Sequence, residues 1–366
     1  MTGALTIALS AGGEVAIGDG ILHTLGERLV GLGHRGRAFV ISDVRVAARH
    51  GQATLDALGR AGLNPALRAI EGGEGAKTLA QAGELYGWLA DQRAERRDAI
   101  VALGGGVIGD LAGFVAATYL RGVALVQVPT TVLAQIDSAI GGKTAVNLPQ
   151  GKNLVGAFHQ ARLTLIDVAL LDGLPDRDFR AGWAEVIKTA LIFDEPLFEQ
   201  LEYARPQAMP RAELLDVIAR CVRWKLKIVD EDPTEWGPRM LLNFGHTIGH
   251  AIEAAFGYGR YLHGEAVAIG MAGAAEISRR RGLIEAALVA RIEACLVRND
   301  LPVRYDGAAA APETILEAAA SDKKAQGATL RWILLTGLGR PTIAGDVPPA
   351  LVLDVLRHLA AVESAT

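Results

Sequence analysis

Residues 99–110 read AIVALGGGVIGD, an apolar run that leads directly into three glycines, and a helical pattern follows at Val107–Thr118. Gly104, Gly106 and Gly109 match the G-x-G-x-x-G pattern of dinucleotide-binding turns. Glycines let the backbone approach a pyrophosphate, and the N-terminus of the next helix supplies N–H groups and positive potential. The pattern therefore predicts strand, turn and helix. It leaves two explanations open, a nucleotide site or tight strand–helix packing without a ligand.

Similar apolar runs recur through the first half of the chain, at Ala38–Ser42, Val123–Pro129 and Leu163–Asp167. A helical pattern lies at Leu55–Gly62, and Leu5–Leu9 alternates weakly like a strand. Continuous apolar runs separated by helices are typical of parallel strands covered on both faces. The first half is therefore predicted to be an α/β domain with a Rossmann-like, mostly parallel sheet.

The second half has a different pattern. From Asp178 onward apolar residues recur at helical spacing, as in Glu213–Val229 and Gly264–Arg279, and strand-like runs are nearly absent before Arg331–Thr336. This half is predicted to be mostly α-helical, with a boundary near Pro175. The prediction is two domains, residues 1–175 and 176–366, which fits a chain of 366 residues at roughly 100–200 residues per domain.

Composition and charge exclude several classes of protein. Half the residues are apolar and 21% are charged, which suits packed cores rather than disorder. Lys plus Arg is 37 and Asp plus Glu is 41, a net charge of −4, so neither nucleic acid nor a membrane surface is an expected partner. No Lys or Arg precedes Arg28, and no apolar stretch approaches the ~20 residues of a membrane span. Cys221 and Cys295 are predicted core thiols of a reducing compartment, so a cytoplasmic location is expected.

Two further segments favour a nucleotide in the first half. Asp43 ends an early predicted strand, and Thr130 and Thr131 follow another. Ligands of open α/β sheets bind outside the carboxyl ends of the strands, so these residues and the glycine turn are expected to line one crevice. The arrangement is not that of an ordinary dehydrogenase, because there the glycine turn lies near the start of the domain and an acid follows ~20 residues later.

Residues 137–153 read DSAIGGKTAVNLPQGKN. The Gly-Gly-Lys-Thr piece resembles the end of a P-loop, but that motif requires glycine at the position of Asp137, so ATP is not predicted. A glycine-bearing loop with Lys143 and Lys152 remains, with Arg121 upstream, and it suits an anionic substrate. The alternative is a solvated basic loop.

A possible metal site lies in the helical half. His246 and His250 are four residues apart and share one face of a helix, and His263 follows. Thr247 stands where a zincin protease has its catalytic glutamate, which argues against that class. Glu185 offers a carboxylate, and two histidines with one carboxylate leave the open coordination position of a catalytic zinc site. The alternative is that these histidines are hydrogen-bonded core residues.

Taken together, the blocks GGGVIGDLAGFVAATYLRGVALVQVPTT, DSAIGGKTAVN, GKN, AEVIK, LNFGHTIGHAIE and LHGEAVAIGM resemble the 3-dehydroquinate synthases, one family of sugar phosphate cyclases, in order and over about residues 38–336. The resemblance implies a dehydroquinate synthase-like fold, with an NAD-binding α/β domain at 1–175 and a helical metal- and substrate-binding domain at 176–366. It implies tightly held NAD and a divalent metal, Zn²⁺ or Co²⁺. It also implies a homodimer that converts a phosphorylated sugar acid, 3-deoxy-D-arabino-heptulosonate 7-phosphate, to 3-dehydroquinate in the shikimate pathway.

The resemblance also implies roles for individual residues. The implied metal ligands are Glu185, His246 and His263. The implied catalytic and substrate-binding residues are Asp137, Lys143, Lys152, Asn153, Lys188, Lys225, Arg239, Asn243 and His250, with Arg121 reaching the substrate phosphate from the partner subunit and Lys323 or Lys324 closing over the substrate. The implied NAD contacts are Asp43, Glu74, Lys77, Gly105, Gly106, Val107, Asp110, Thr130 and Thr131, with Lys143 and Lys152 beside them.

The chain departs from the family pattern at Gly173, where a threonine near the cofactor is usual, and at Pro233, where an acid is common. Related inosose- and valiolone-forming cyclases change several of the substrate-side residues, whereas this chain keeps Lys188, Arg239, Asn243 and His250. Two rival readings remain. An NAD-dependent polyol dehydrogenase would not need the cations of residues 137–153, and a non-enzymatic dinucleotide sensor would not need the metal set.

Overall fold

The computed structural model describes residues 4–10, 12–233, 235, 237–257, 259–324 and 331–361, the side chains of 321–324 excepted. The chain divides into two compact units, Met1–Pro175 with Arg211–Asp230, and Asp176–Pro210 with Glu231–Thr366. The long helix α8 (Arg211–Glu231) thus belongs almost entirely to the first unit, whereas the sequence pattern placed it in the second half. Within the described ranges, no helix has both the length and the apolar character that a membrane crossing requires.

The first unit is built on a seven-stranded sheet with the order β1-β2-β9-β6-β5-β3-β4. β1 is antiparallel to β2, and all the other neighbours are parallel, so the predicted Rossmann-like, mostly parallel sheet is confirmed. In sheet order the strands are β1 (Leu5–Ala8), β2 (Glu14–Gly18), β9 (Leu163–Asp167), β6 (Ala124–Pro129), β5 (Ala99–Gly104), β3 (Ala38–Asp43) and β4 (Ala66–Ile70).

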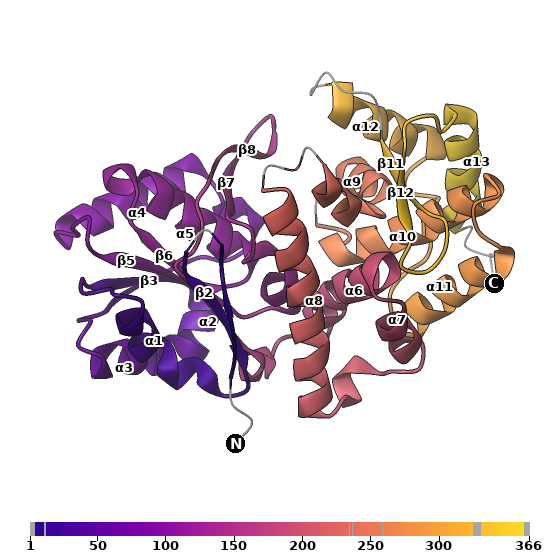
Figure 1. Cartoon of the computed structure of the whole chain (residues 1–366). Helices are drawn as coiled ribbons and strands as arrows, with labels where there is room; N and C mark the ends of the chain where they lie inside the picture. The colour runs from indigo at the N-terminus through magenta and orange to yellow at the C-terminus, as the bar shows by residue number, and fades with distance from the viewer. Residues whose placement is uncertain are drawn as a thin grey trace. The chain divides into compact units, whose positions relative to one another are not determined.

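Successive side chains along each strand point to opposite sides of the sheet. Because the central strands are apolar at successive positions, both faces of the sheet are apolar. Val40 and Val101 pack with α1 (Leu25–Gly31) and α3 (Gln52–Arg60). Their neighbours Phe39 and Ile100 pack with α4 (Leu79–Asp91) and α5 (Gly106–Thr118). Figure 1 shows these two pairs of helices on opposite sides of the sheet. Burial on both faces explains why the central strands have continuous apolar sequences.

A two-stranded antiparallel hairpin, β7 (Lys143–Leu148) and β8 (Gly151–Phe158), stands where the sequence analysis expected a loop. That expectation was wrong. Thr144 and Val146 are buried and alternate with more exposed neighbours, which is the period of a strand with one covered face. The glycines and lysines around them obscured this alternation. The remaining short elements of this unit are η1 (Ile21–Thr24), α2 (Val44–Val46), η2 (Ala47–Gly51), η3 (Glu74–Ala76), η4 (Tyr119–Arg121), η5 (Ala134–Ser138) and η6 (Val168–Leu171).

The second unit is mostly helical, as predicted. Its helices are α6 (Asp176–Phe193), α7 (Glu195–Leu201), α9 (His246–Ala255), α10 (His263–Arg280), α11 (Ala286–Arg298), α12 (Pro312–Lys324) and α13 (Pro349–Leu359), with the short turns η7 (Pro206–Ala208) and η8 (Pro238–Asn243). Two small strand pairs accompany them, β11 (Trp332–Leu335) with β12 (Pro341–Ala344), and β10 (Tyr305–Asp306) with β13 (Ala360–Ala361).

Helix α10 is the centre of this unit, buried from Gly264 to Ser278 and packed against α6, α9, α11 and α13. Two of its glycines allow close approach to neighbouring backbone. A Cβ at Gly264 would lie 1.7 Å from the carbonyl oxygen of Ala181 on α6, and one at Gly270 would lie 1.9 Å from that of Gly245. Only glycine fits at these contacts. The glycines therefore bring the start of α9, the start of α10 and the middle of α6 together.

Candidate active site

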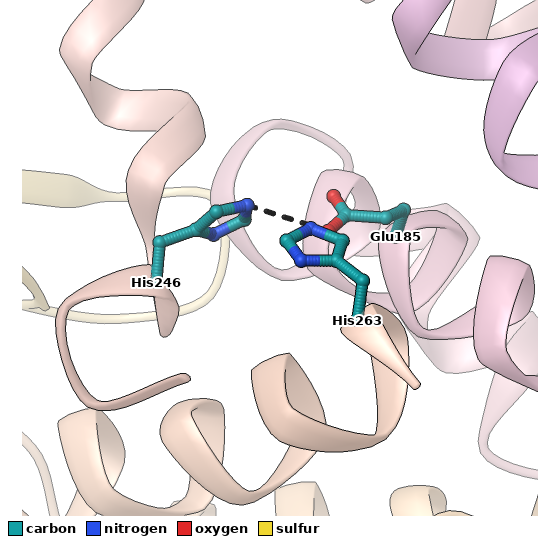
Figure 2. A group of neighbouring side chains, drawn as sticks. All are labelled: Glu185, His246 and His263. Atoms are coloured by element: carbon teal, nitrogen blue, oxygen red, sulfur yellow. Dashed lines mark ion pairs between the residues drawn. The ribbon is translucent and has the colours of Figure 1, made fainter. Parts of the chain in front are cut away.

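Glu185 on α6, His246 at the start of α9 and His263 at the start of α10 form one group, in which Glu185 is buried and the two histidines are partly buried. One potential ligand atom from each lies within 4.8 Å of the others. Oε1 of Glu185 is 3.5 Å from Nε2 of His246 and 3.5 Å from Nε2 of His263. Figure 2 shows both imidazole rings turned toward the carboxylate. The structure thus gathers the three predicted metal ligands.

The geometry of this group fits a divalent cation. Ligand atoms about 2.0–2.2 Å from a tetrahedral zinc ion lie about 3.4 Å from one another, close to the 3.5 Å separations found here. Both carboxylate oxygens of Glu185 are buried without a hydrogen-bond donor of normal geometry among the described residues, although Lys188 forms an ion pair with one of them. A buried carboxylate in this state is expected to coordinate a cation.

The charges of the group follow from its burial. Burial lowers the pKa of His246 to about 3, and the charge of Lys188 acts in the same direction. Burial also opposes a charge on His263, but Glu185 and Glu253 outweigh it and raise its pKa to about 9. Burial works against the charge of Glu185, yet Lys188 and the two histidines hold its pKa well below the usual range. His246 is therefore neutral at neutral pH, the form that binds metal.

Two more predicted residues lie beside the ligands. Lys188, one turn after Glu185 on α6, is 1% exposed and pairs with its carboxylate. His250 is one turn after His246 on α9, and its ring centroid is 5.3 Å from that of His246 and 5.8 Å from that of His263. Lys188 thus lies beside Glu185 on α6, and His250 lies on the same face of α9 as His246.

Arg239 and Asn243 lie on η8, directly before α9. Arg239 is fully buried, and its Nη1 donates to the carbonyl oxygen of Pro233 at 2.9 Å. The backbone N–H of Arg239 donates to Asp232 at 3.2 Å, and Asn243 donates to Glu235 at 3.1 Å. Pro233 therefore positions Arg239 through its backbone, a contact that the departure from the family pattern does not remove.

In the first unit, three neighbouring parallel strands end at one edge of the sheet. β5 pairs with β3 on one side and β6 on the other, so Asp43, Gly104 and Pro129 are the ends of adjacent strands. Gly105 precedes α5, which begins at Gly106, so the predicted strand–turn–helix is confirmed.

Glycine at the turn allows a close approach of the backbone to its surroundings. A Cβ at Gly105 would lie only 3.1 Å from Cγ2 of Thr131, so the turn packs tightly against that residue. The hydroxyl of Thr130 is buried and has no partner among the described residues. The α5 N-terminus, the glycines and this hydroxyl fit a dinucleotide. Asp43 also has a structural role, because its carboxylate accepts two backbone N–H groups at 3.0 Å and caps α2.

A polar network joins four of the predicted residues near this edge. Lys77 is buried, forms an ion pair with Asp110 and donates to the side chain of Asn153. Asn147 donates to Glu74 at 2.7 Å and accepts the backbone N–H of Asn153 at 2.9 Å. Burial raises the pKa of Asp110, against the charge of Lys77. The hairpin β7–β8 thus supplies Asn147 and Asn153 to this network. Its other members are Glu74 on η3, Lys77 directly after η3, and Asp110 on α5.

The remaining predicted residues are placed separately. Asp137 and Lys225 form an ion pair between η5 and α8. Arg121 ends η4 on an exposed turn, with a φ of 66°. Gly173 has a φ of 78°, which a threonine would adopt only with strain. Lys143 and Lys152 lie on the hairpin, Val107 lies in the first turn of α5, and Lys323 and Lys324 end α12, where their side chains lie outside the described residues.

Three residues of these groups were not predicted from the sequence, namely Asn147, Glu235 and Glu253. Glu253 is seven residues after His246, two turns along the same helix, so helical spacing offered a signal for it. Asn147 and Glu235 gave none, because their partners come from distant or irregular segments.

The sheet with its glycine turn and the candidate Glu–His–His metal site point to a class of enzyme, and the comparisons with known proteins identify it. Residues 67–181 match the 3-dehydroquinate synthase N-terminal family, and residues 182–325 match the 3-dehydroquinate synthase C-terminal family. The chain belongs to the 3-dehydroquinate synthase family.

Individual relatives agree with this assignment. The 3-dehydroquinate synthase of Paracoccus denitrificans is 46% identical over 348 residues, covering 94% of this chain and 95% of that protein. The 3-dehydroquinate synthase of Gloeobacter violaceus is 43% identical, with 94% and 96% covered.

Solved structures share the fold across nearly the whole chain. 2-Deoxy-scyllo-inosose synthase, in complex with carbaglucose-6-phosphate, NAD⁺ and Co²⁺, has a TM-score of 0.86 at 31% identity, covering 97% of this chain and 99% of that chain. 2-Epi-5-epi-valiolone synthase from Streptomyces hygroscopicus, with NAD⁺ and Zn²⁺ bound, has a TM-score of 0.87 at 28% identity and covers 98% of both chains. A probable glycerol dehydrogenase from Sinorhizobium meliloti, at 16% identity and a TM-score of 0.62, with 93% and 94% covered, shows the fold alone.

Proposed function

We propose that this chain catalyses the 3-dehydroquinate synthase reaction of the shikimate pathway, the conversion of 3-deoxy-D-arabino-heptulosonate 7-phosphate to 3-dehydroquinate and phosphate. The observation that carries the proposal is the group of Glu185, His246 and His263, with Lys188 and His250 beside it, in a chain of this family. The reaction class is a lyase: an alcohol is oxidised, phosphate is eliminated, the ketone is reduced again, and the opened ring closes by an intramolecular aldol step.

The proposed NAD site is the edge formed by β3, β5 and β6 in the first unit. NAD would accept a hydride from the substrate and return it within one turnover. The glycine turn would receive the pyrophosphate at the N-terminus of α5. The proposed contacts are Asp43, Glu74, Lys77, Gly105, Gly106, Val107, Asp110, Thr130 and Thr131, with Lys143 and Lys152 near them.

The proposed metal ligands are Glu185, His246 and His263, with Zn²⁺ as the expected ion and Co²⁺ suited to the same donors. A divalent ion there would lower the pKa of a bound substrate hydroxyl. Lys188, which forms an ion pair with Glu185, would favour an anionic oxygen nearby. His250, one turn from His246, would carry protons to and from the substrate through water. A hydrogen bond that only supports the metal ligands is the alternative role for His250.

The substrate carries a phosphate and a carboxylate, and the proposed groups match these charges. Lysine and arginine bind such groups by charge-assisted hydrogen bonds. The proposed substrate and catalytic residues are Asp137, Lys143, Lys152, Asn153, Lys188, Lys225, Arg239, Asn243 and His250, with Arg121 of the partner subunit and one of Lys323 and Lys324. The homodimer, the cytoplasmic location and the functional division at residue 175 stay predictions.

A panel of substrates tests the proposal. The purified chain, supplied with NAD and Zn²⁺, is given the heptulosonate 7-phosphate, glucose 6-phosphate or glycerol. We expect phosphate release only from the heptulosonate, with dehydroquinate detected through added dehydratase. Release from glucose 6-phosphate instead would indicate an inosose-forming cyclase. Net formation of NADH from glycerol would indicate a polyol dehydrogenase, and either result would contradict the proposal.

A further inference from the structure

Glu253 is a buried carboxylate that no assigned ligand or substrate role explains. It lies on α9 among the buried residues Ile248, Ala251 and Ile252, and only 7% of it is exposed. A charged group is costly in such a place unless it is paired. Its Oε2 lies 3.2 Å from Nδ1 of His263, the first residue of α10. One contact of this buried carboxylate is therefore with a ring nitrogen of a proposed metal ligand.

When a metal ion takes the place of one proton of His263, this contact keeps the remaining proton on Nδ1. A carboxylate that faces Nδ1 accepts the N–H there and leaves the lone pair on Nε2. Nε2 is the atom that lies 3.5 Å from Glu185. His246 is held in the same way by a neutral group, because its Nδ1 lies 3.2 Å from the carbonyl oxygen of Phe244 while its Nε2 faces Glu185. Both imidazoles thus present Nε2 to one point, but only His263 is oriented by a charged group.

The charge balance gives Glu253 a second effect. Among the three ligands Glu185 is the only carboxylate, and its charge is opposed by the ion pair with Lys188. The three ligands together with Lys188 therefore offer a divalent cation almost no net negative charge. Glu253 supplies one more negative charge, which lies on the far side of the His263 ring and attracts the cation across it. Because the surroundings are buried, that charge is weakly screened.

We propose that Glu253 is a positioning residue of the metal site, which orients His263 through Nδ1 and supplies the negative charge that retains the divalent cation. The proposal rests on the proposed metal role of Glu185, His246 and His263. It assigns Glu253 no contact with the substrate. Loss of such a partner behind a metal-bound histidine typically costs 10–100-fold in metal affinity.

The experiment measures the dissociation constant of Zn²⁺ by chelator competition, together with the number of ions bound per chain. It compares the wild type with three variants. Glu253→Gln keeps an acceptor for Nδ1–H but loses the charge, Glu253→Asp keeps the charge but is too short for the contact, and Glu253→Ala loses both. Glu276→Gln is the control, since Glu276 is another buried glutamate of the same unit, paired with Arg279 and Arg280.

We expect one ion per chain, a loss of Zn²⁺ affinity of about 10–100-fold in Glu253→Gln and in Glu253→Asp, a larger loss in Glu253→Ala and none in Glu276→Gln. The visible spectrum of bound Co²⁺ should change in the Glu253 variants, whereas NAD affinity should not. If either Glu253→Gln or Glu253→Asp does not fold, the Zn²⁺ affinity of the other variant still tests the inference.

Wild-type Zn²⁺ affinity in the Glu253 variants, with only a lower melting temperature, would overturn the inference and leave a structural role. Two ions per chain would also overturn it, because Glu253, His250 and His263 would then hold a second ion directly. If the wild type binds no Zn²⁺, the proposed metal site itself fails, and with it the inference.

Discussion

Glu185 has the most unusual surroundings of the residues described. It is 1% exposed, lies against Lys188 on its own helix and faces two histidine rings from other helices. The two histidines are held in different states, since burial lowers the pKa of His246 to about 3 while Glu185 and Glu253 outweigh burial and raise that of His263 to about 9. A divalent cation would displace a proton from His263, and the charge of the ion would then take the place of the charge that the histidine loses.

A second buried ion pair gives a prediction about stability. Lys77 is 3% exposed and forms an ion pair with Asp110. Replacing Lys77 with methionine leaves the partly buried carboxylate of Asp110 without its cation, which should lower the free energy of unfolding by at most about 3–5 kcal/mol. Lys77→Met combined with Asp110→Asn should regain part of this loss. Urea unfolding of the three proteins measures the effect.

A Lys77→Met protein as stable as the wild type, or a double variant that regains nothing, would contradict this reading of the pair. NAD affinity, measured on the same proteins, should fall in both variants because both residues are proposed contacts of the cofactor.

At the scale of elements, α10 decides the geometry of the second unit. Gly264, next to His263, packs so closely on Ala181 that a methyl group there must separate α10 from α6, the helix that carries Glu185. Gly264→Ala should therefore destabilise the protein by about 1–3 kcal/mol or more through overpacking. It should also weaken Zn²⁺ binding.

Gly83→Ala is the matched control. Gly83 lies within α4, is exposed, and a Cβ there would meet nothing within 4 Å. Alanine in an open helical position should stabilise the protein by about 0.5–1 kcal/mol. Opposite signs in thermal unfolding are the expected result. Equal effects of the two substitutions would mean that the α6–α10 contact is not as tight as described.

The end of α10 gives a prediction about pH. Glu276 accepts hydrogen bonds from Arg279 at 2.7 Å and from Arg280 at 2.6 Å, and Arg280 also pairs with Asp354 on α13. Arg279 in the first place, with Arg280 and against the effect of burial, lowers the pKa of Glu276 from 4.5 to about 2. A carboxylate with a depressed pKa stabilises the folded state above its unfolded pKa, and this contribution is lost as pH falls toward the folded pKa.

Wild type should therefore exceed Glu276→Gln in stability at about pH 7, and the difference should shrink as the pH falls below about 4.5 toward 2. Urea unfolding over a series of pH values measures it, with Glu285→Gln on an exposed position as the control. A difference that stays constant with pH, or that grows in acid, would show that the arginines do not hold the carboxylate in its charged form.

The sequence predicted elements best where burial is uniform. β5 and β9 are apolar on both faces, so their sequences alone located them nearly to the residue. The hairpin β7–β8 was missed because its buried Thr144 and Val146 alternate with lysine, asparagine and glycine, a mixture that is also typical of a loop. β4 was missed because this edge strand carries the exposed Arg68 and only its last residue is fully buried.

The candidate site divides in the same way. Local motifs located the glycine turn, Glu185 and the histidines. Glu235 and Asn147 act through partners that only the folded chain brings near, so no local pattern singles them out. The spacing of Glu253 from His246 places it on the same face of α9, but its partner His263 comes from another helix. The placement of α8 with the first unit depends on packing, and the spacing of its apolar residues only predicts that it is a helix.

At the scale of the whole molecule, the proposed role of Arg121 requires two subunits. If Arg121 acts on the site of its partner, a mixed dimer of an Arg121→Ala chain and a His246→Ala chain has one complete site. In that site the Arg121→Ala chain supplies the intact His246, and the His246→Ala chain supplies the intact Arg121. Each variant alone should be nearly inactive, and the mixed dimer should regain about half of the wild-type activity, as expected when one of two equivalent sites works.

Differently tagged chains, refolded or co-expressed and purified as the mixed species, allow this measurement. No recovery in a mixed dimer that is shown to form would mean that Arg121 serves its own subunit. A protein that sediments as a monomer would remove the basis of the prediction.

The most direct test of the account follows three products in one reaction. The purified chain is supplied with Zn²⁺, NAD and the heptulosonate 7-phosphate, and phosphate, dehydroquinate and NADH are measured together, with and without a chelator. We expect one phosphate for each dehydroquinate, no net NADH, and loss of both products when the metal is removed. Accumulation of NADH in step with turnover, or NAD and metal bound without phosphate release, would contradict it.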